Sequence, residues 1–148
     1  MKKLQPLLEK AAHIASTGVN SFLREDLDFG LAYNEGVMLV EVTFVAIGMN
    51  PDGRCDGLLH ADPGKDWTTQ LDVVNDDEVV AWASFATETT GGINYDKEID
   101  LHEQMFARNL TLLANHTAAS SSLVMLLKYH RVILDDSEMV GIVAHRRG

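Results

Sequence analysis

The chain has 148 residues, a formal net charge of −10 and 46% hydrophobic residues. We expect one domain over 1–148, since domains commonly have about 100–200 residues and this length can enclose a core. The acidic balance argues against a protein that coats nucleic acid by counterion release alone, although it permits local basic patches.

No apolar run approaches the roughly 18 residues that a membrane span requires. The N-terminal region has no continuous apolar stretch either, because Glu9, Lys10 and His13 interrupt it. We therefore expect neither a membrane segment nor a secretory signal. We expect the chain to be synthesised in the cytosol.

Residues 3–17 carry apolar side chains at helical spacing, which predicts an N-terminal helix within 1–20. Gly18 follows as a helix stop, and Pro6 falls near the first turn, where its missing N–H does least harm. We expect this helix to pack on the body of the protein, with a partner-binding arm as the alternative. The apolar stripe comprises Leu4, Leu7, Leu8, Ala11, Ala12 and Ala15.

From Leu27 the apolar period changes to two, which indicates strands. Turn signals such as 50–53 (Asn-Pro-Asp-Gly) and 62–65 (Asp-Pro-Gly-Lys) separate the segments. Short turns between consecutive strands are typical of an antiparallel meander, here within 27–113. We expect its strands at about 37–49, 54–61, 67–74, 79–88 and 99–113, with 27–33 as a sixth candidate.

The segment 99–113 fits two structures, because its apolar residues suit a helical stripe while its run 110–113 suits a strand. Beyond Ala114 the spacing predicts two helices within 117–148, separated by Asp135 and Asp136, with Ser137 capping the second. Two apolar helices after a sheet must cover that sheet or another subunit. The predicted fold class is therefore α+β.

No enzyme pattern is recognisable among the titratable residues. The six histidines lack the spacing of a metal site, so we expect no metal, no cofactor and no catalytic residues. Cys55 is the lone cysteine and is interpreted as a buried or edge thiol. Arginine on a strand, with glutamine or threonine neighbours, can meet phosphates and base edges. The candidate RNA-binding residues are Arg54, Thr68, Gln70, Gln104 and Arg108.

From Gln104 to the C-terminus, the order of residues resembles the C-terminal part of the coat proteins of small single-stranded RNA bacteriophages, the levivirus type. In that family this part forms the last strand of a five-stranded meander and two closing helices. The resemblance therefore favours a strand at 99–113. The predicted N-terminal helix stands in place of the family's usual hairpin. The matching residues are Gln104, Phe106, 109–115 (Asn-Leu-Thr-Leu-Leu-Ala-Asn), Thr117, Ser120, Leu126, Lys128, Val132, 137–140 (Ser-Glu-Met-Val), Val143, Arg147 and Gly148.

The resemblance implies a capsid subunit of a single-stranded RNA bacteriophage, made in the bacterial host cytoplasm and found in the virion. It implies a homodimer that assembles into an icosahedral shell around genomic RNA, with an RNA hairpin bound on the inner face of the sheet. The implied dimer interface comprises Leu123, Leu126, Leu127, Ile133, Met139 and Val143.

Two other hypotheses remain open. One is an acidic, dimeric intracellular binding protein, similar to a secretion chaperone or an immunity protein. The other is a small enzyme with a pocket between sheet and helices, for which the sequence offers no convergent titratable groups.

Overall fold

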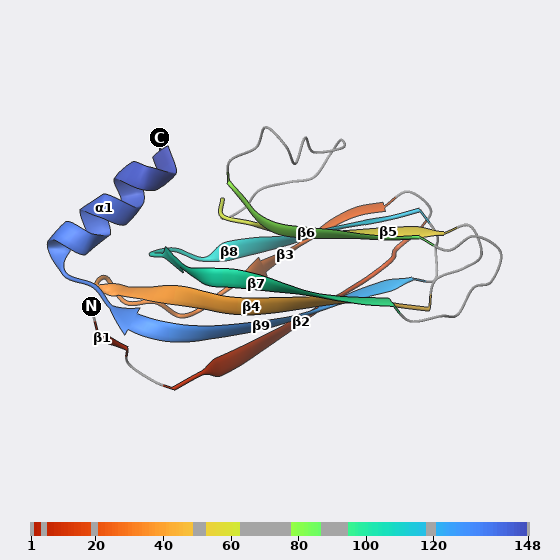
Figure 1. Cartoon of the computed structure of the whole chain (residues 1–148). Coiled ribbons are helices and arrows are strands. Elements are labelled where there is room, and N and C mark those ends of the chain that lie inside the picture. The colour runs from red at the N-terminus through yellow and green to blue at the C-terminus, as the bar shows by residue number, and fades with distance from the viewer. Residues whose placement is uncertain are drawn as a thin grey trace.

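The computed structural model describes residues 2–3, 6–18, 21–48, 53–62, 78–86, 95–117 and 121–147. The regular structure of these residues is almost entirely β-strand, in two antiparallel sheets that form a sandwich (Figure 1). A C-terminal helix, α1 (Asp136–Arg147), follows the last strand. The strands are β1 (Lys2–Lys3), β2 (Leu8–Ala15), β3 (Ser21–Leu27), β4 (Glu35–Ile47), β5 (Arg54–His60), β6 (Val79–Ala86), β7 (Tyr95–Phe106), β8 (Leu110–His116) and β9 (Ser122–Ile133).

The strand order follows a simple rule. The chain pairs like one long hairpin, with β2 on β9, β3 on β8, β4 on β7 and β5 on β6. In addition, β9 pairs with β4 and β8 pairs with β5, so the two arms of this long hairpin lie in both sheets. Sheet A thus contains β1, β2, β9, β4 and β7, and sheet B runs in the order β3-β8-β5-β6. Two such sheets, built from Greek-key connections, define a jelly roll.

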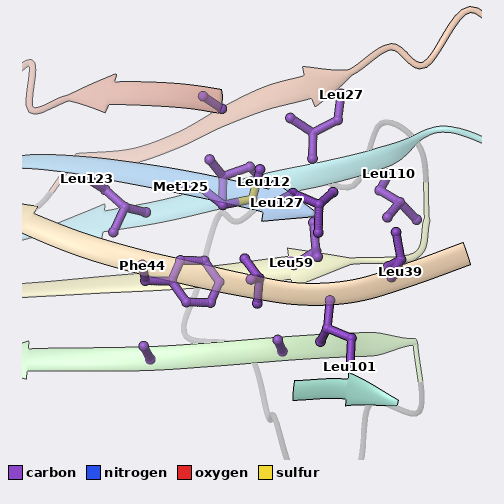
Figure 2. Packing of buried hydrophobic residues seen from close by; sticks show 14 of the residues in the cluster. Leu27, Leu39, Phe44, Leu59, Leu101, Leu110, Leu112, Leu123, Met125 and Leu127 are labelled. Atoms are coloured by element: carbon purple, nitrogen blue, oxygen red, sulfur yellow. The ribbon is translucent and has the colours of Figure 1, made fainter. Parts of the chain in front are cut away.

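The core lies between the two sheets. In β4, Val42, Phe44 and Ala46 point inward and are fully buried, while the residues between them lie on the outer face. Figure 2 shows Phe44 together with leucines that reach the core from both sheets. Fully burying one such side chain contributes about 1.5–3 kcal/mol, so this shared core holds the two sheets together.

The prediction of a meander with helices at both ends is wrong. Within 1–20, where a helix was predicted, the regular structure of the described residues consists of the strands β1 and β2. β2 pairs along its whole length with β9, with Ala12 and Ile14 facing the core and Ala11 and His13 facing out. The alanines of this segment favour a helix, but helix propensity is a weak preference that tertiary pairing overrides. The candidate strand 27–33 is also displaced, because β3 ends at Leu27.

The first of the two predicted C-terminal helices is also wrong. Its residues form β9, the strand that joins β2 to β4 in the middle of sheet A. The second predicted helix is present as α1, but Ser137 does not cap it. The Glu138 N–H donates to Asp135 Oδ1 at 2.7 Å, and Glu138 Oε1 accepts from the Asp135 N–H at 3.3 Å. This reciprocal capping box lowers the pKa of Asp135.

The predicted strand 99–113 is two strands in different sheets. β7 ends at Phe106 in sheet A, and β8 begins at Leu110 in sheet B. Asn109 fixes the corner between them, since its Oδ1 accepts a hydrogen bond from the Phe29 N–H at 3.0 Å. Within β7, His102 and Glu103 have positive φ angles of 52° and 57°, opposite a register shift in β4. Such a bulge re-aims the strand before the chain changes sheets.

Three predicted strands are confirmed. The expected strands at 37–49, 54–61 and 79–88 correspond to β4, β5 and β6. The expected strand at 67–74 lies outside the described residues. Among the residues that the structure does describe, no helix is both long and apolar enough to cross a membrane.

Candidate functional site

The three described residues of the predicted RNA-binding set, Arg54, Gln104 and Arg108, are not gathered on one surface. Arg54 begins β5, while Arg108 precedes β8 at the other end of sheet B. Since β5 has seven residues, the two ends are about 20 Å apart. Gln104 belongs to sheet A, opposite Leu39. Thr68 and Gln70 lie outside the described residues, and RNA binding at these positions stays a prediction.

Both of these arginines face a carboxylate. Arg54 Nε donates to Asp56 Oδ1 at 3.0 Å, and Arg108 Nη2 lies 3.3 Å from Glu78 Oε1. Asp56 Oδ1 also accepts from Ser84 Oγ at 2.5 Å. The positive charge of each arginine is therefore partly neutralised within the subunit.

The predicted dimer interface is divided by the alternation of β9. Leu123 and Leu127 are fully buried in the chain's own core, which excludes a helical interface through them. Leu126 and Ile133 are half-buried, and Met139 of α1 packs beside a small cluster of Met38, Val132 and Leu134. The side chain of Val143 lies outside the described part. Contact of Leu126, Ile133, Met139 and Val143 with a second copy stays a prediction.

One end of the core holds a buried histidine beside the lone cysteine. His116 pairs with Cys55 across β8 and β5, and its Nδ1 lies 2.8 Å from Ser121 Oγ. Burial lowers the pKa of His116, an effect that the Ile14 backbone and the charge of Asp56 partly offset.

Cys55 is held in its protonated form. Burial first, and then the charge of Asp56, raises the pKa of its thiol to about 12. A nucleophilic thiol requires a lowered pKa, so this pair is not activated for nucleophilic chemistry. The described residues contain no group of three or more His, Cys, Asp or Glu side chains arranged to hold a metal ion.

The outer face of sheet A carries a row of carboxylates, which we call the acidic strip: Glu41, Asp96, Glu98 and Asp100. Glu41 lies opposite Asp100, and Thr43 opposite Glu98, so these side chains share one face. A hydrogen bond between Glu98 and Glu41, together with the negative charge of Glu41, raises the pKa of Glu98. Lys128 Nζ is 3.5 Å from Glu41 Oε1.

The acidic strip was missed in the sequence because β4 and β7 are far apart along the chain. Its one local signal is the alternation of acids at Asp96, Glu98 and Asp100, which places three carboxylates on one face of a strand. Apolar side chains lie beside the strip on the same outer face. Val45, Val124 and Leu126 are half-buried, and Ala11 is exposed.

The described basic side chains of the sandwich all have a partner within the chain. Five form ion pairs and two lie over aromatic rings, at distances typical of cation–π contacts. Lys65 lies outside the described residues, and the other basic residues are at the chain ends: Lys2, Lys3, Arg146 and Arg147. The pairs are Arg24–Asp26, Arg54–Asp56, Arg108–Glu78, Lys128–Glu41 and Arg131–Glu35, and the ring contacts are Lys10–Phe29 and Lys97–Trp82.

Comparison with solved structures gives distant similarities. The K3 adhesin domain of Lys-gingipain from Porphyromonas gingivalis W83 is 11% identical, with a TM-score of 0.33, over 85% of this chain and 73% of that chain. The capsid protein of BFDV is 10% identical, with a TM-score of 0.36, over 84% and 94% of the two chains.

A structure of infectious bursal disease virus, Gx strain, is 8% identical, with a TM-score of 0.31, over 86% of this chain and 37% of that chain. No protein-family model and no curated protein matches the sequence.

Proposed function

We propose that the chain is a structural subunit of a virus shell, which self-assembles into closed particles and is found in the virion. The observation that carries this proposal is the strand order of the two sheets, which is that of a jelly roll. This architecture is used for capsid subunits, although it also occurs in lectin domains and cupins. The distinction must therefore come from the surfaces of this chain.

Two surface features favour assembly. The helix α1 follows β9 and lies at the end of the sandwich, away from the middle of either sheet (Figure 1). Val140 in this helix keeps 68% of its surface exposed. The outer face of sheet A, in turn, presents partly exposed apolar side chains such as Val124 and Leu126. Apolar surface of this kind is buried when copies of a chain associate.

The cargo of the shell is proposed to be single-stranded RNA. Support for this comes from the resemblance of the stretch from Gln104 to Gly148 to the coat proteins of RNA bacteriophages. The bacteriophage architecture itself is not proposed, because the sandwich replaces the meander and its covering helices. The jelly-roll strand order supports the shell, and the sequence resemblance supports the RNA.

The test is size-exclusion chromatography of the protein expressed in bacteria, with light scattering and absorbance at 260 and 280 nm. Shell formation requires a peak far larger than a dimer. A ratio of 260 to 280 nm absorbance typical of nucleic acid, lost after RNase but not after DNase, would support RNA as cargo. DNase sensitivity would overturn the RNA assignment and leave the shell standing.

A different outcome would favour the binding-protein alternative. A stable dimer that forms no particles and binds basic partner proteins would replace the shell proposal with that of an acidic intracellular binding protein. The acidic strip is the surface that such a partner would contact, and its charge reversal would then abolish the binding.

A further inference from the structure

We infer that the outer face of sheet A is the docking site for helix α1 of a neighbouring copy of the chain. This inference rests on the proposed shell function and names the surfaces through which its subunits contact each other. The receiving face consists of the apolar residues Val45, Val124 and Leu126 with the acidic strip beside them. The docking element is α1, whose last two residues are Arg146 and Arg147.

The described contacts of α1 within its own subunit lie at its first turn. Its first turn is fixed by the Asp135–Glu138 capping box, and Met139 packs against the cluster of Met38, Val132 and Leu134. Val140 and Gly141, immediately after this contact, are exposed. Helices of about 12 residues are marginal in water without tertiary packing, so α1 gains stability from a surface that covers it.

The receiving face has the matching chemistry. Its apolar residues lie on β9 and β4, at the middle of the sheet, and the acidic strip follows the edge strand β7. Glu41 and Glu98 lie next to each other on this face, and the hydrogen bond to Glu41, followed by its negative charge, raises the pKa of Glu98. Arginines placed beside this pair would offset its negative charge.

Charge distribution within the chain points to another copy as the source of those arginines. The described lysines and arginines of the sandwich already face a carboxylate or an aromatic ring, whereas basic residues also stand at both chain ends. Arg146 and Arg147 of α1 carry the charge opposite to that of the acidic strip. Complementary charge of this kind steers association and fixes its register.

The geometry agrees with docking between copies. The helix begins where β9 ends, beside Glu35 and Met38, and the acidic strip extends from the middle of sheet A towards Asp96 at the opposite end. With 12 residues α1 is about 18 Å long. The strip from Asp96 to Asp100 spans about 13 Å. A helix of this length from a second subunit is therefore long enough to cover the strip.

A cross-linking experiment tests the contact in the full-length protein. Two single variants, Val140→Cys and Leu126→Cys, are mixed and oxidised. The native Cys55 is buried and does not interfere. If α1 docks on sheet A of another copy, the mixture is expected to form more disulfide-linked dimer than either variant forms alone. The matched control replaces Leu126→Cys by Trp82→Cys, since Trp82 is exposed on the outer face of sheet B.

Charge reversal tests the second half of the inference. The double variant Arg146→Glu/Arg147→Glu is expected to weaken association at least tenfold at low salt. A second pair of changes, Glu41→Lys/Glu98→Lys, is expected to restore association when combined with the first. Because the contact is partly between exposed charges, association of the wild-type chain is expected to fall as salt rises.

The results separate this inference from the function on which it rests. Normal particles from the Arg146→Glu/Arg147→Glu variant, with no excess of Val140–Leu126 cross-linking, overturn the docking site and leave the shell function intact. A wild-type chain that forms no particle but still gives the specific cross-link overturns the shell function and retains the contact. Equal cross-linking to Leu126→Cys and to the Trp82→Cys control also overturns the docking site.

Discussion

Replacing Leu127 and its neighbour Leu126, one at a time, by alanine distinguishes the observed strand β9 from a helix. In the strand, Leu127 faces the core and is fully buried, whereas Leu126 lies on the outer face and is half-buried. Leu→Ala removes the equivalent of about three CH₂ or CH₃ groups, or roughly 2.4 kcal/mol of transfer free energy. The cavity left between the sheets raises the expected cost of Leu127→Ala to about 3–4 kcal/mol. For Leu126→Ala the expected cost is about 1 kcal/mol, because no enclosed cavity forms.

The assay is urea unfolding followed by circular dichroism, at a protein concentration at which the subunits are separate. The free energy of unfolding and the slope of the transition are compared for the two variants and the wild type. A helix that used both leucines in one interface would lose similar stability from either change. Equal costs for the two variants, or a larger cost for Leu126→Ala, would refute the assignment of β9 to the middle of the sandwich.

The remaining predictions concern single buried groups. Burial lowers the pKa of His116 in the folded state, so the free energy of unfolding is expected to fall as the pH drops below the unfolded-state value of 6.5. In unfolding curves measured from pH 7 to 5, His116→Gln is expected to flatten this dependence. A variant with the same pH dependence as the wild type would contradict the role of His116. The thiol of Cys55, with a pKa of about 12, is expected to resist a thiol reagent at pH 8 until denaturant is added, and rapid labelling of the native protein would contradict its burial. A Cβ on Gly57 would lie 2.8 Å from Leu123 Cδ2, so Gly57→Val is expected to lower the unfolding free energy by about 1–3 kcal/mol. The control Gly18→Val, which has no atom within 4 Å of its Cβ, is expected to change it little, and equal effects at the two glycines would argue against close sheet packing at Gly57.

The predicted bounds of β4 and β6 agree with the structure to about two residues at either end. The sequence predicts these strands because β4 is rich in β-branched residues and turn or loop signals bound both segments. Prediction fails at β9, because its outward-facing Val124 and Leu126 are also apolar. Apolar residues on both faces of a strand remove the period of two, and the remaining spacing imitates a helical stripe.

The sheet order could not be predicted for a different reason. Short turns between strands favour a meander, but each connection in this chain from β2 to β5 leads to a strand that is not its hydrogen-bonded neighbour. Partner choice depends on contacts between distant segments, such as Ala12 with Met125 in the pairing of β2 and β9. A local pattern of turns carries no information about such pairs.

The candidate surfaces were only partly visible in the sequence. The second C-terminal helix was predicted from the break at Asp135 and Asp136 and from the apolar residues after it. The acidic strip was not, because Glu41 meets Glu98 and Asp100 only after β4 and β7 pair. The arginines chosen as RNA contacts were selected by residue type, and their carboxylate partners Asp56 and Glu78 come from the fold.

Electron microscopy of the purified full-length protein tests the central claim, that this jelly roll is a shell subunit, most directly. The expected result is closed, uniform particles whose wall, in a three-dimensional reconstruction, fits the two sheets of the sandwich with α1 of one subunit over sheet A of the next. Micrographs that show only small, separate molecules at every protein concentration and ionic strength tested would contradict the claim that the chain is a shell subunit.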